Sequence, residues 1–160
     1  MTYKQYKEKF IKKEFEIDKN NAVYGYAKFS KKIFSHLRSY YNNLEEMIVQ
    51  LRNERIEHIM DRHPEVVQLI KKEFKKIINN PDYIFKDKKH DDTIWICKKS
   101  KKKSGLMLVI KLKLGEHNSN FKNSIITGRK TDIERYVKSN NGLLIYKKND
   151  VWFDYYRNMW

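Results

Sequence analysis

The period of the hydrophobic pattern changes at the turn-forming run NNPD, residues 79–82. Before this run, apolar residues recur at helical intervals, and after it they alternate with polar residues as in strands. In LMLVIKLKL (106–114), leucine and isoleucine occupy one face of a strand, while Lys111 and Lys113 occupy the other. The pattern predicts an α+β protein in which helices come first and a sheet follows.

Three helical stretches are predicted early in the chain: residues 3–17, residues 22–41, and a stretch that continues through Leu44, Ile48 and Leu51 toward residue 60. A helix break follows at His63 and Pro64. Proline disfavours helical backbone in the residue before it and is itself favoured at the start of a helix. We therefore expect one helix to end near residues 61–62 and the next to run from Pro64 to NNPD.

The second half of the chain carries the strand signals. Strands are predicted for YIFK (83–86), TIWIC (93–97), LMLVIKLKL (106–114), SIITG (124–128) and LLIYK (143–147), and a capped helix for residues 131–142. The lysine-dense run between the second and third strands, residues 98–105, is typical of a hairpin loop. The aromatic tail VWFDYYRNMW is expected to pack on this chain or on a partner.

The charge balance points to a polyanionic partner. The chain has 35 Lys and Arg against 20 Asp and Glu, a net charge of +15, so nucleic acid is the leading partner class. An apolar content of 40% argues against disorder. The sequence has no apolar run long enough to span a membrane, and its N-terminus lacks the apolar core of a signal peptide. This predicts a protein that is cytoplasmic, or delivered by another component, and that has no membrane partner. Cys97 is the only cysteine, so an intrachain disulfide is excluded.

The run ERIEHIMDRHPEVV (54–67) contains the strongest candidate chemistry. On a helix, Arg55, His58 and Arg62 fall in one sector, opposite the apolar residues. A histidine between two guanidinium groups loses its proton more readily, which suits a general base, and the arginines could hold a phosphate. This arrangement fits metal-free RNA cleavage. The alternative is that these are ordinary surface residues and that His63 only caps the next helix.

Metal and cofactor sites are not predicted. The five histidines are scattered, no clustered carboxylates complete a ligand set, and the sequence has no glycine-rich phosphate loop or dinucleotide fingerprint.

A family resemblance covers about residues 54–148. The run ERIEHIMDRHPEVVQLIKKEFKKIINNPDYIFKD, followed by IWICKK, LMLVIKLKL and NSIITGRKTDIERYVKSNNGLLIYKK, resembles the phage-associated branch of the Barnase–EndoU–colicin–RelE nuclease fold. The resemblance implies N-terminal helices packed on a four- to five-stranded antiparallel sheet whose open face binds RNA. It divides the chain into a helical extension (1–50), a toxin-like endoribonuclease domain (51–148) and the aromatic tail (149–160).

The resemblance also implies site residues. Catalytic roles are expected for His58, Arg62, His63, Ser124 and Thr127. Contacts with the substrate are expected for Arg55, Lys111, Lys113, Asn123 and Arg129. Members of this branch often have an aromatic residue after IIT, where this chain has Gly128 and then Arg129, so Arg129 is expected to meet the RNA base instead. For the late-strand residues, the alternative is a strand edge with ordinary polar faces.

Three other interpretations stay open. Arg52 and Asn53 followed by His58 resemble the signature of HEPN ribonucleases, whose fold is all-helical. The same cations could instead belong to a basic RNA- or DNA-binding module without catalytic activity. A toxin-like nuclease would also need control, and a surface this basic would suit an acidic antitoxin or immunity protein. The oligomeric state is not predicted.

Overall fold

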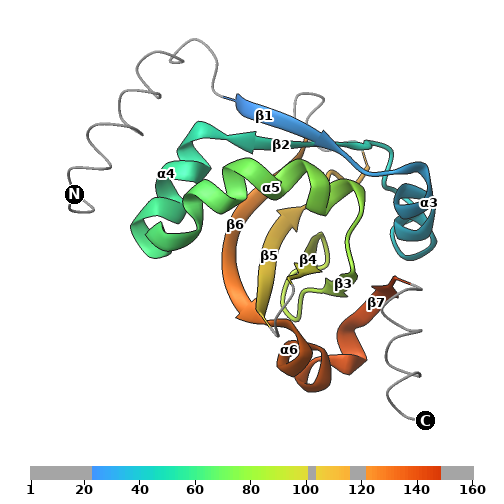
Figure 1. The fold of residues 1–160 in the computed structure, drawn as a ribbon. Helices are drawn as coiled ribbons and strands as arrows, with labels where there is room; N and C mark the ends of the chain where they lie inside the picture. The colour runs from blue at the N-terminus through green and yellow to red at the C-terminus, as the bar shows by residue number, and fades with distance from the viewer. Residues whose placement is uncertain (1–22, 101–103, 116–121, 149–160) are drawn as a thin grey trace.

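The computed structural model describes residues 23–100, 104–115 and 122–148. In this part the chain forms the following elements (Figure 1): β1 (Val23–Lys28), α3 (Lys31–Tyr40), β2 (Ile48–Arg52), α4 (Asn53–Arg62), α5 (Val67–Asn79), β3 (Tyr83–Lys86), β4 (Thr93–Lys99), β5 (Ser104–Lys111), β6 (Asn123–Asp132), α6 (Ile133–Ser139) and β7 (Leu144–Lys147). Short 3-10 turns occupy Pro64–Val66 and Asn141–Leu143. The helix predicted over residues 3–17 and the aromatic tail lie outside the described residues.

The described strands form one seven-stranded sheet in the order β1-β2-β6-β5-β4-β3-β7. Neighbouring strands are antiparallel except β2 and β6, which run parallel. The α+β class is confirmed. The expectation of four to five antiparallel strands is wrong, because β1 and β2 come from a segment that was predicted to be helical and extend the sheet beyond β6.

The predicted helices over residues 22–41 and 44–60 each begin too early. Residues 23–28 form a strand, and the first helix starts only after Ser30, whose hydroxyl accepts a hydrogen bond from the Ile33 N–H. Residues 48–52 form β2, and α4 starts at Asn53. The physical reason is tertiary pairing, because β2 lies between β1 and β6 and hydrogen-bonds to both. The apolar spacing in these short runs fits the helical period as well as the strand period.

The break at Pro64 and the stop at NNPD are confirmed. Helix α4 ends at Arg62, with the His63 N–H bonded to the Ile59 carbonyl, and α5 ends at Asn79. The three strands that follow form an antiparallel meander, as predicted.

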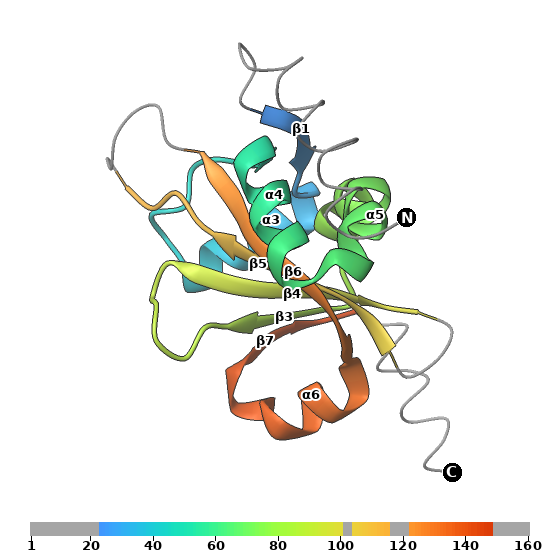
Figure 2. The ribbon, with the colours of Figure 1, turned by 90° about the vertical axis from the view of Figure 1, so that its left-hand side faces the viewer.

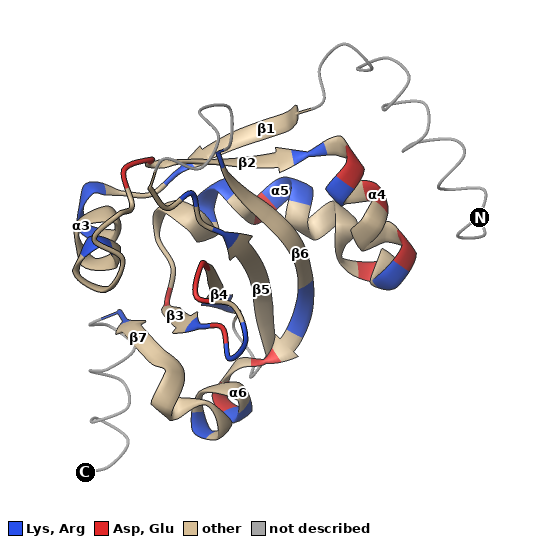
Figure 3. Cartoon of the chain, turned by 180° about the vertical axis from the view of Figure 1, so that it is seen from behind, with Lys and Arg blue, Asp and Glu red and all other residues tan. Residues whose placement is uncertain are grey.

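Helices cover the two faces of the sheet unequally. Helices α4 and α5 pack on one face, against alternate residues of β5 such as Leu108 and Ile110. The small helix α6 packs on the opposite face, against Phe85 and Met107 (Figure 2). Strand β5 is therefore buried on both faces along most of its length. Because α6 covers only one end of its face, the upper part of that face stays open beside β2 and β6 (Figure 3).

Candidate functional site

A row of polar side chains crosses four strands on the open face of the sheet. Thr93 of β4 lies opposite Lys111 of β5, Lys111 opposite Ser124 of β6, and Ser124 opposite Gln50 of β2. Directly opposed residues point to the same face, so these side chains form a continuous strip, which we call the polar row. The residues beside it in these strands are mainly buried and apolar, which makes the row a distinct feature of the sheet.

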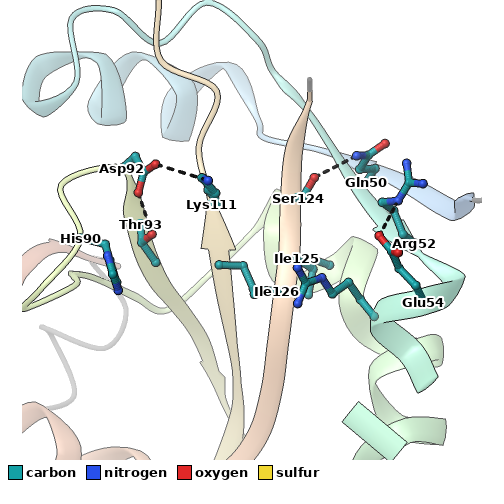
Figure 4. A pocket seen from close by; sticks show the side chains of 11 residues that line it. Gln50, Arg52, Glu54, His90, Asp92, Thr93, Lys111, Ser124, Ile125 and Ile126 are labelled. Atoms are coloured by element: carbon teal, nitrogen blue, oxygen red, sulfur yellow. Dashed lines mark hydrogen bonds and ion pairs between the residues drawn. The ribbon is translucent and has the colours of Figure 1, made fainter. Parts of the chain in front are cut away.

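A cavity of about 590 Å³ lies over the polar row (Figure 4). The start of α4 forms one side of it, and the loop between β3 and β4 forms the other. Its lining residues are Gln50, Arg52, Glu54, Arg55, His90, Asp92, Thr93, Lys111, Ser124, Ile125 and Ile126. This volume falls in the range of typical small-ligand pockets, so a nucleotide-sized group fits.

The cations of the cavity differ in how far they are neutralised. Arg52 Nε lies 3.0 Å from Glu54 Oε1, and Lys111 Nζ lies 4.0 Å from Asp92 Oδ2. Among the described residues, no hydrogen bond or ion pair involves the side chain of Arg55, which is half-buried. A guanidinium group without a carboxylate partner can accept an anionic ligand without first breaking an ion pair. Arg55 is therefore the leading anion-binding group of the cavity.

Ser124 is held in place by two hydrogen bonds. Its hydroxyl accepts a bond of 2.9 Å from Gln50 Nε2 and donates one of 3.0 Å to the Lys122 carbonyl. Gln50 is itself only 8% exposed, so the pair is fixed in the floor of the cavity. The arrangement presents a hydroxyl beside the Lys111 ammonium.

Asn123 is buried completely, in contrast to its predicted contact with the substrate. Its Nδ2 donates to the carbonyl oxygens of Glu46 and Ile48 at 2.6 and 3.0 Å, and its Oδ1 accepts 2.7 Å from the Lys113 N–H. All of the polar atoms of this amide are thus engaged with backbone. Asn123 joins β2, β6 and the segment after β5, and an RNA strand could reach it only if these bonds were broken.

A β-bulge brings Thr127 to the same face as Ser124. Residues three apart in a regular strand point to opposite faces. The register of β5 and β6 shifts between Val109 and Ile110, so that Val109 pairs with Thr127 while Lys111 pairs with Ser124. The bulge inserts one extra residue in β6 and leaves both hydroxyls on the open face.

His58 and Arg62 lie along α4, away from the lining of the cavity. Arg55 lines it, His58 follows one turn later, and Arg62 follows a turn after that and is exposed. One turn advances about 5 Å along the axis, so the row of three leads from the cavity along the helix. His63 occupies the end of α4, where its ring Nδ1 lies 4.0 Å from Glu65 Oε1.

Arg129 and Lys113 lie outside the cavity. The Arg129 guanidinium carbon sits 5.1 Å from the centre of the Trp95 ring, and that ring stacks on Tyr136 of α6. Arg129 Nε is buried and makes no hydrogen bond to the described residues. Lys113 follows the end of β5, and its N–H bonds to Asn123. The structure thus brings together only Arg55, Lys111 and Ser124 of the predicted residues in the cavity.

His90 is the histidine of the cavity that sequence reasoning missed. It lies in the loop of residues 87–92, which Asp87 holds by accepting hydrogen bonds from the N–H groups of Lys89 and His90 and from Trp95 Nε1. Burial acts to raise the pKa of Asp87, but these bonds outweigh it and lower the pKa below its ordinary value. A usable signal existed, since His90 lies shortly before Thr93, the first residue of β4 and the partner of Lys111.

Gln50, Arg52, Asp92 and Thr93 also line the cavity without having been predicted. They reach it through pairing between segments far apart in sequence, which local spacing does not show.

The described segments contain no group of three His, Cys, Asp or Glu side chains placed to hold a metal ion. They also contain no helix of the length and apolar content needed to cross a bilayer.

Together, the fold and the cavity define a mixed α+β protein with a basic pocket on the open face of its sheet. A family model described as phage-Barnase-EndoU-ColicinE5/D-RelE like nuclease3 matches residues 26–135, more than half of the chain. The chain belongs to this nuclease family, which confirms the resemblance seen in the sequence. The match begins within β1, so the family region includes the second half of β1 and all of β2. No curated protein and no solved structure matches the chain.

Proposed function

We propose that this nuclease is a metal-independent, toxin-like endoribonuclease whose cavity over the polar row binds the phosphate that is cleaved. The observation that carries the proposal is the convergence of Arg55, Lys111, Ser124 and His90 on one cavity. Cations and hydroxyl donors are what a phosphorane needs, and a histidine supplies proton transfer near neutral pH. Membership of the nuclease family supports the same conclusion.

The proposed reaction is an attack of the ribose 2′-oxygen on the adjacent phosphorus. A base takes the proton of the 2′-hydroxyl, the new P–O bond forms a 2′,3′-cyclic phosphate, and the bond from phosphorus to the 5′-oxygen breaks. An acid protonates the departing 5′-oxygen, so the atoms balance without a metal or a water. Arg55 and Lys111 stabilise the extra negative charge, and Ser124 supplies a hydroxyl donor if its single O–H turns from the Lys122 carbonyl to the phosphate. Thr127 lies on the same face of β6, beyond the lining of the cavity, and would contact the RNA there.

Proton transfer is proposed from two sides of the cavity, by one histidine of its lining and one that lies beyond it. In an in-line displacement the attacking and leaving oxygens lie on opposite sides of the phosphorus. His90 approaches from the β3–β4 loop, and His58 lies one turn along α4 from Arg55 on the other side. We assign the two proton transfers to this pair. His63 and Arg62, further along α4, act as auxiliary groups that contact RNA outside the cavity.

The test is incubation of the purified protein with total RNA in EDTA, followed by mapping of the new ends. We expect 2′,3′-cyclic phosphate ends and losses of about 100-fold or more in rate for His58→Ala and His90→Ala. Arg55→Ala should lower the rate of cleavage by a similar factor. Arg38→Ala, an exposed arginine of α3 outside the cavity, is the matched control and should cleave like the wild type.

Intact RNA at high protein concentration would reject catalysis and favour the alternative of a basic RNA- or DNA-binding module. Undiminished cleavage by both histidine variants would reject the assigned site while leaving a nuclease. The HEPN interpretation is not carried further, because a seven-stranded sheet is incompatible with an all-helical fold.

Control by an acidic antitoxin or immunity protein stays a prediction. Carboxylates of such a partner would meet Arg55 and Lys111 at the cavity and compete with RNA. Competition between an acidic binding protein and RNA, weakened in the Arg55→Ala variant, is the measurement that would support it.

A further inference from the structure

Tyr26 extends the polar row by one strand. It lies on β1 directly opposite Gln50, whose side chain forms part of the cavity floor. Opposed residues on neighbouring antiparallel strands have Cβ atoms about 5 Å apart and share a face. Tyr26 therefore stands at the end of the row, on the open side of the sheet and next to the cavity.

The ring of Tyr26 is exposed at the edge of the sheet. Its exposed fraction is 52%, the highest among the exposed large hydrophobic residues of the described chain. Among those residues no aromatic ring stacks on it. The face of the Tyr26 ring is therefore available to an aromatic ligand.

The side chains of Tyr24 and Tyr26 lie on opposite faces of the sheet. The register of β1 shifts between Val23 and Gly25, and the Tyr24 ring lies 6.2 Å from Phe74 of α5, on the packed face. Gly25 leaves room for the same phenylalanine, because a Cβ there would lie 3.1 Å from it. Tyr26 is thus the tyrosine of β1 that is free to meet a ligand of the cavity.

A competing aromatic platform on the same face is already occupied. Trp95 is covered by the Arg129 guanidinium group and by Tyr136. A base arriving there would have to displace one of them. Tyr26 would receive a base without any such displacement.

We propose that Tyr26 is a base-stacking platform for the RNA nucleotide that flanks the one in the cavity. Single-stranded RNA is commonly held by cations on its phosphates and aromatic rings on its bases. Arg55 and Lys111 supply the first element, and Tyr26 supplies the second at the β1 edge. The inference rests on the proposed function in one respect, namely that the cavity holds an RNA phosphate. It predicts the path of the RNA over the sheet, which runs from the cavity across β2 toward β1.

The test is the affinity for a labelled single-stranded oligonucleotide whose 2′-O-methyl groups prevent cleavage. Tyr26→Ala should raise the Kd about tenfold through the loss of stacking, while Tyr26→Phe should bind like the wild type because the ring is kept. Tyr40→Ala is the matched control, since Tyr40 is 45% exposed on α3 and does not line the cavity. Placing an abasic site at successive positions should abolish the effect of Tyr26→Ala at one position and so identify the stacked base.

The outcomes separate the two proposals. Equal Kd values for the wild type and a folded Tyr26→Ala variant would overturn the platform, even if RNA is cleaved. Equal weakening in the alanine and phenylalanine variants would also overturn it, because the hydroxyl would then be responsible. A Tyr26-dependent Kd in a protein that never cleaves RNA would support the platform and reject the nuclease mechanism. An effect of Tyr26→Ala on binding a protein partner but not on RNA would overturn it as well.

Discussion

Asn123 and Ser124 are neighbours in β6, but their side chains have different roles. Asn123 is buried and bonds to three backbone groups, whereas Ser124 presents its hydroxyl to the cavity. The family resemblance pointed to both as part of the site, and the sequence could not separate them. Which of two adjacent polar residues faces the core depends on strand register, and here the register is set by pairing with β2 and β5.

Asn123→Ala should therefore act on stability. Removing the amide leaves the Glu46 and Ile48 carbonyls and the Lys113 N–H unpaired near the core, which we expect to cost about 3 kcal/mol in the free energy of unfolding. Urea denaturation measures this loss. Ser124→Ala is the control, and its unfolding free energy should stay within about 1 kcal/mol of the wild type. An Asn123→Ala variant that is fully stable yet binds RNA poorly would show that Asn123 contacts the substrate after all.

At the scale of elements, the loop of residues 87–92 shows how one carboxylate fixes a functional segment. Asp87 accepts three hydrogen bonds, and its pKa in the folded protein lies below the ordinary value. Its contribution to stability is therefore complete above the unfolded-state pKa of about 3.9 and is lost as the pH falls below it, through the folded-state pKa. The loop should loosen in acid, and with it the position of His90.

Asp87→Ala tests this account. We expect a loss of about 1–2 kcal/mol at pH 7, and a smaller drop in stability than the wild type shows on going from pH 5 to pH 3. Thermal unfolding at the two pH values measures both effects. Asp91→Ala, an exposed carboxylate in the same loop, is the matched control. Identical acid sensitivity in the wild type and Asp87→Ala would contradict the assigned role.

Gly128 is required by the approach of α5 to β6. A Cβ at this position would lie 2.7 Å from Ile70 Cδ1 and 3.0 Å from Leu108 Cδ2. The departure from the family pattern after IIT is thus a packing requirement in this chain. Gly128→Ala should destabilise the protein by about 1–3 kcal/mol through overpacking, as measured by urea denaturation. Gly142→Ala meets no atom within 4 Å and is the control. Equal stability of both variants would mean that α5 can shift to admit the methyl group without a loss in the free energy of unfolding.

Elements after NNPD were largely predictable, and those before α4 were not. The short runs YIFK (83–86) and TIWIC (93–97) are rich in aromatic and β-branched residues, which was enough to predict β3 and the start of β4. The segments 23–28 and 48–52 are short, and their apolar spacing does not distinguish helix from strand. They became strands because β6 offers an edge for β2, a partner more than 70 residues away along the chain. A single sequence does not show such a pairing.

At the scale of the whole molecule, the net charge of +15 should dominate RNA affinity. Each phosphate neutralised by a cation releases counterions, so log Kd should change steeply and linearly with log salt concentration. Arg55→Ala should reduce the magnitude of that slope by about 1, because one phosphate contact is lost. Arg38→Ala should leave the slope unchanged. Titrations at several salt concentrations measure both slopes. An unchanged slope for Arg55→Ala would show that Arg55 does not contact a phosphate.

The molecule as a whole was predictable to the level of class and family. The α+β order, the basic charge and the family followed from the sequence, and Arg55, Lys111 and Ser124 do line one cavity. The cavity itself was not predictable. It needs β2 to pair in parallel with β6 and β5 to pair with both β4 and β6, and these pairings join segments that are far apart in the sequence.

The parallel pairing of β2 with β6 also has a consequence for biosynthesis. Residues 50–55 provide one side of the cavity, and residues 124–126 provide its centre, so the floor of the cavity is incomplete until β6 has been translated. A nascent chain that ends before β6 carries the cations but not the hydroxyl that lies among them. Because contacts between distant segments form late, the pocket is completed only after most of the sequence has left the ribosome. The proposed activity would therefore arise only once the chain is nearly complete.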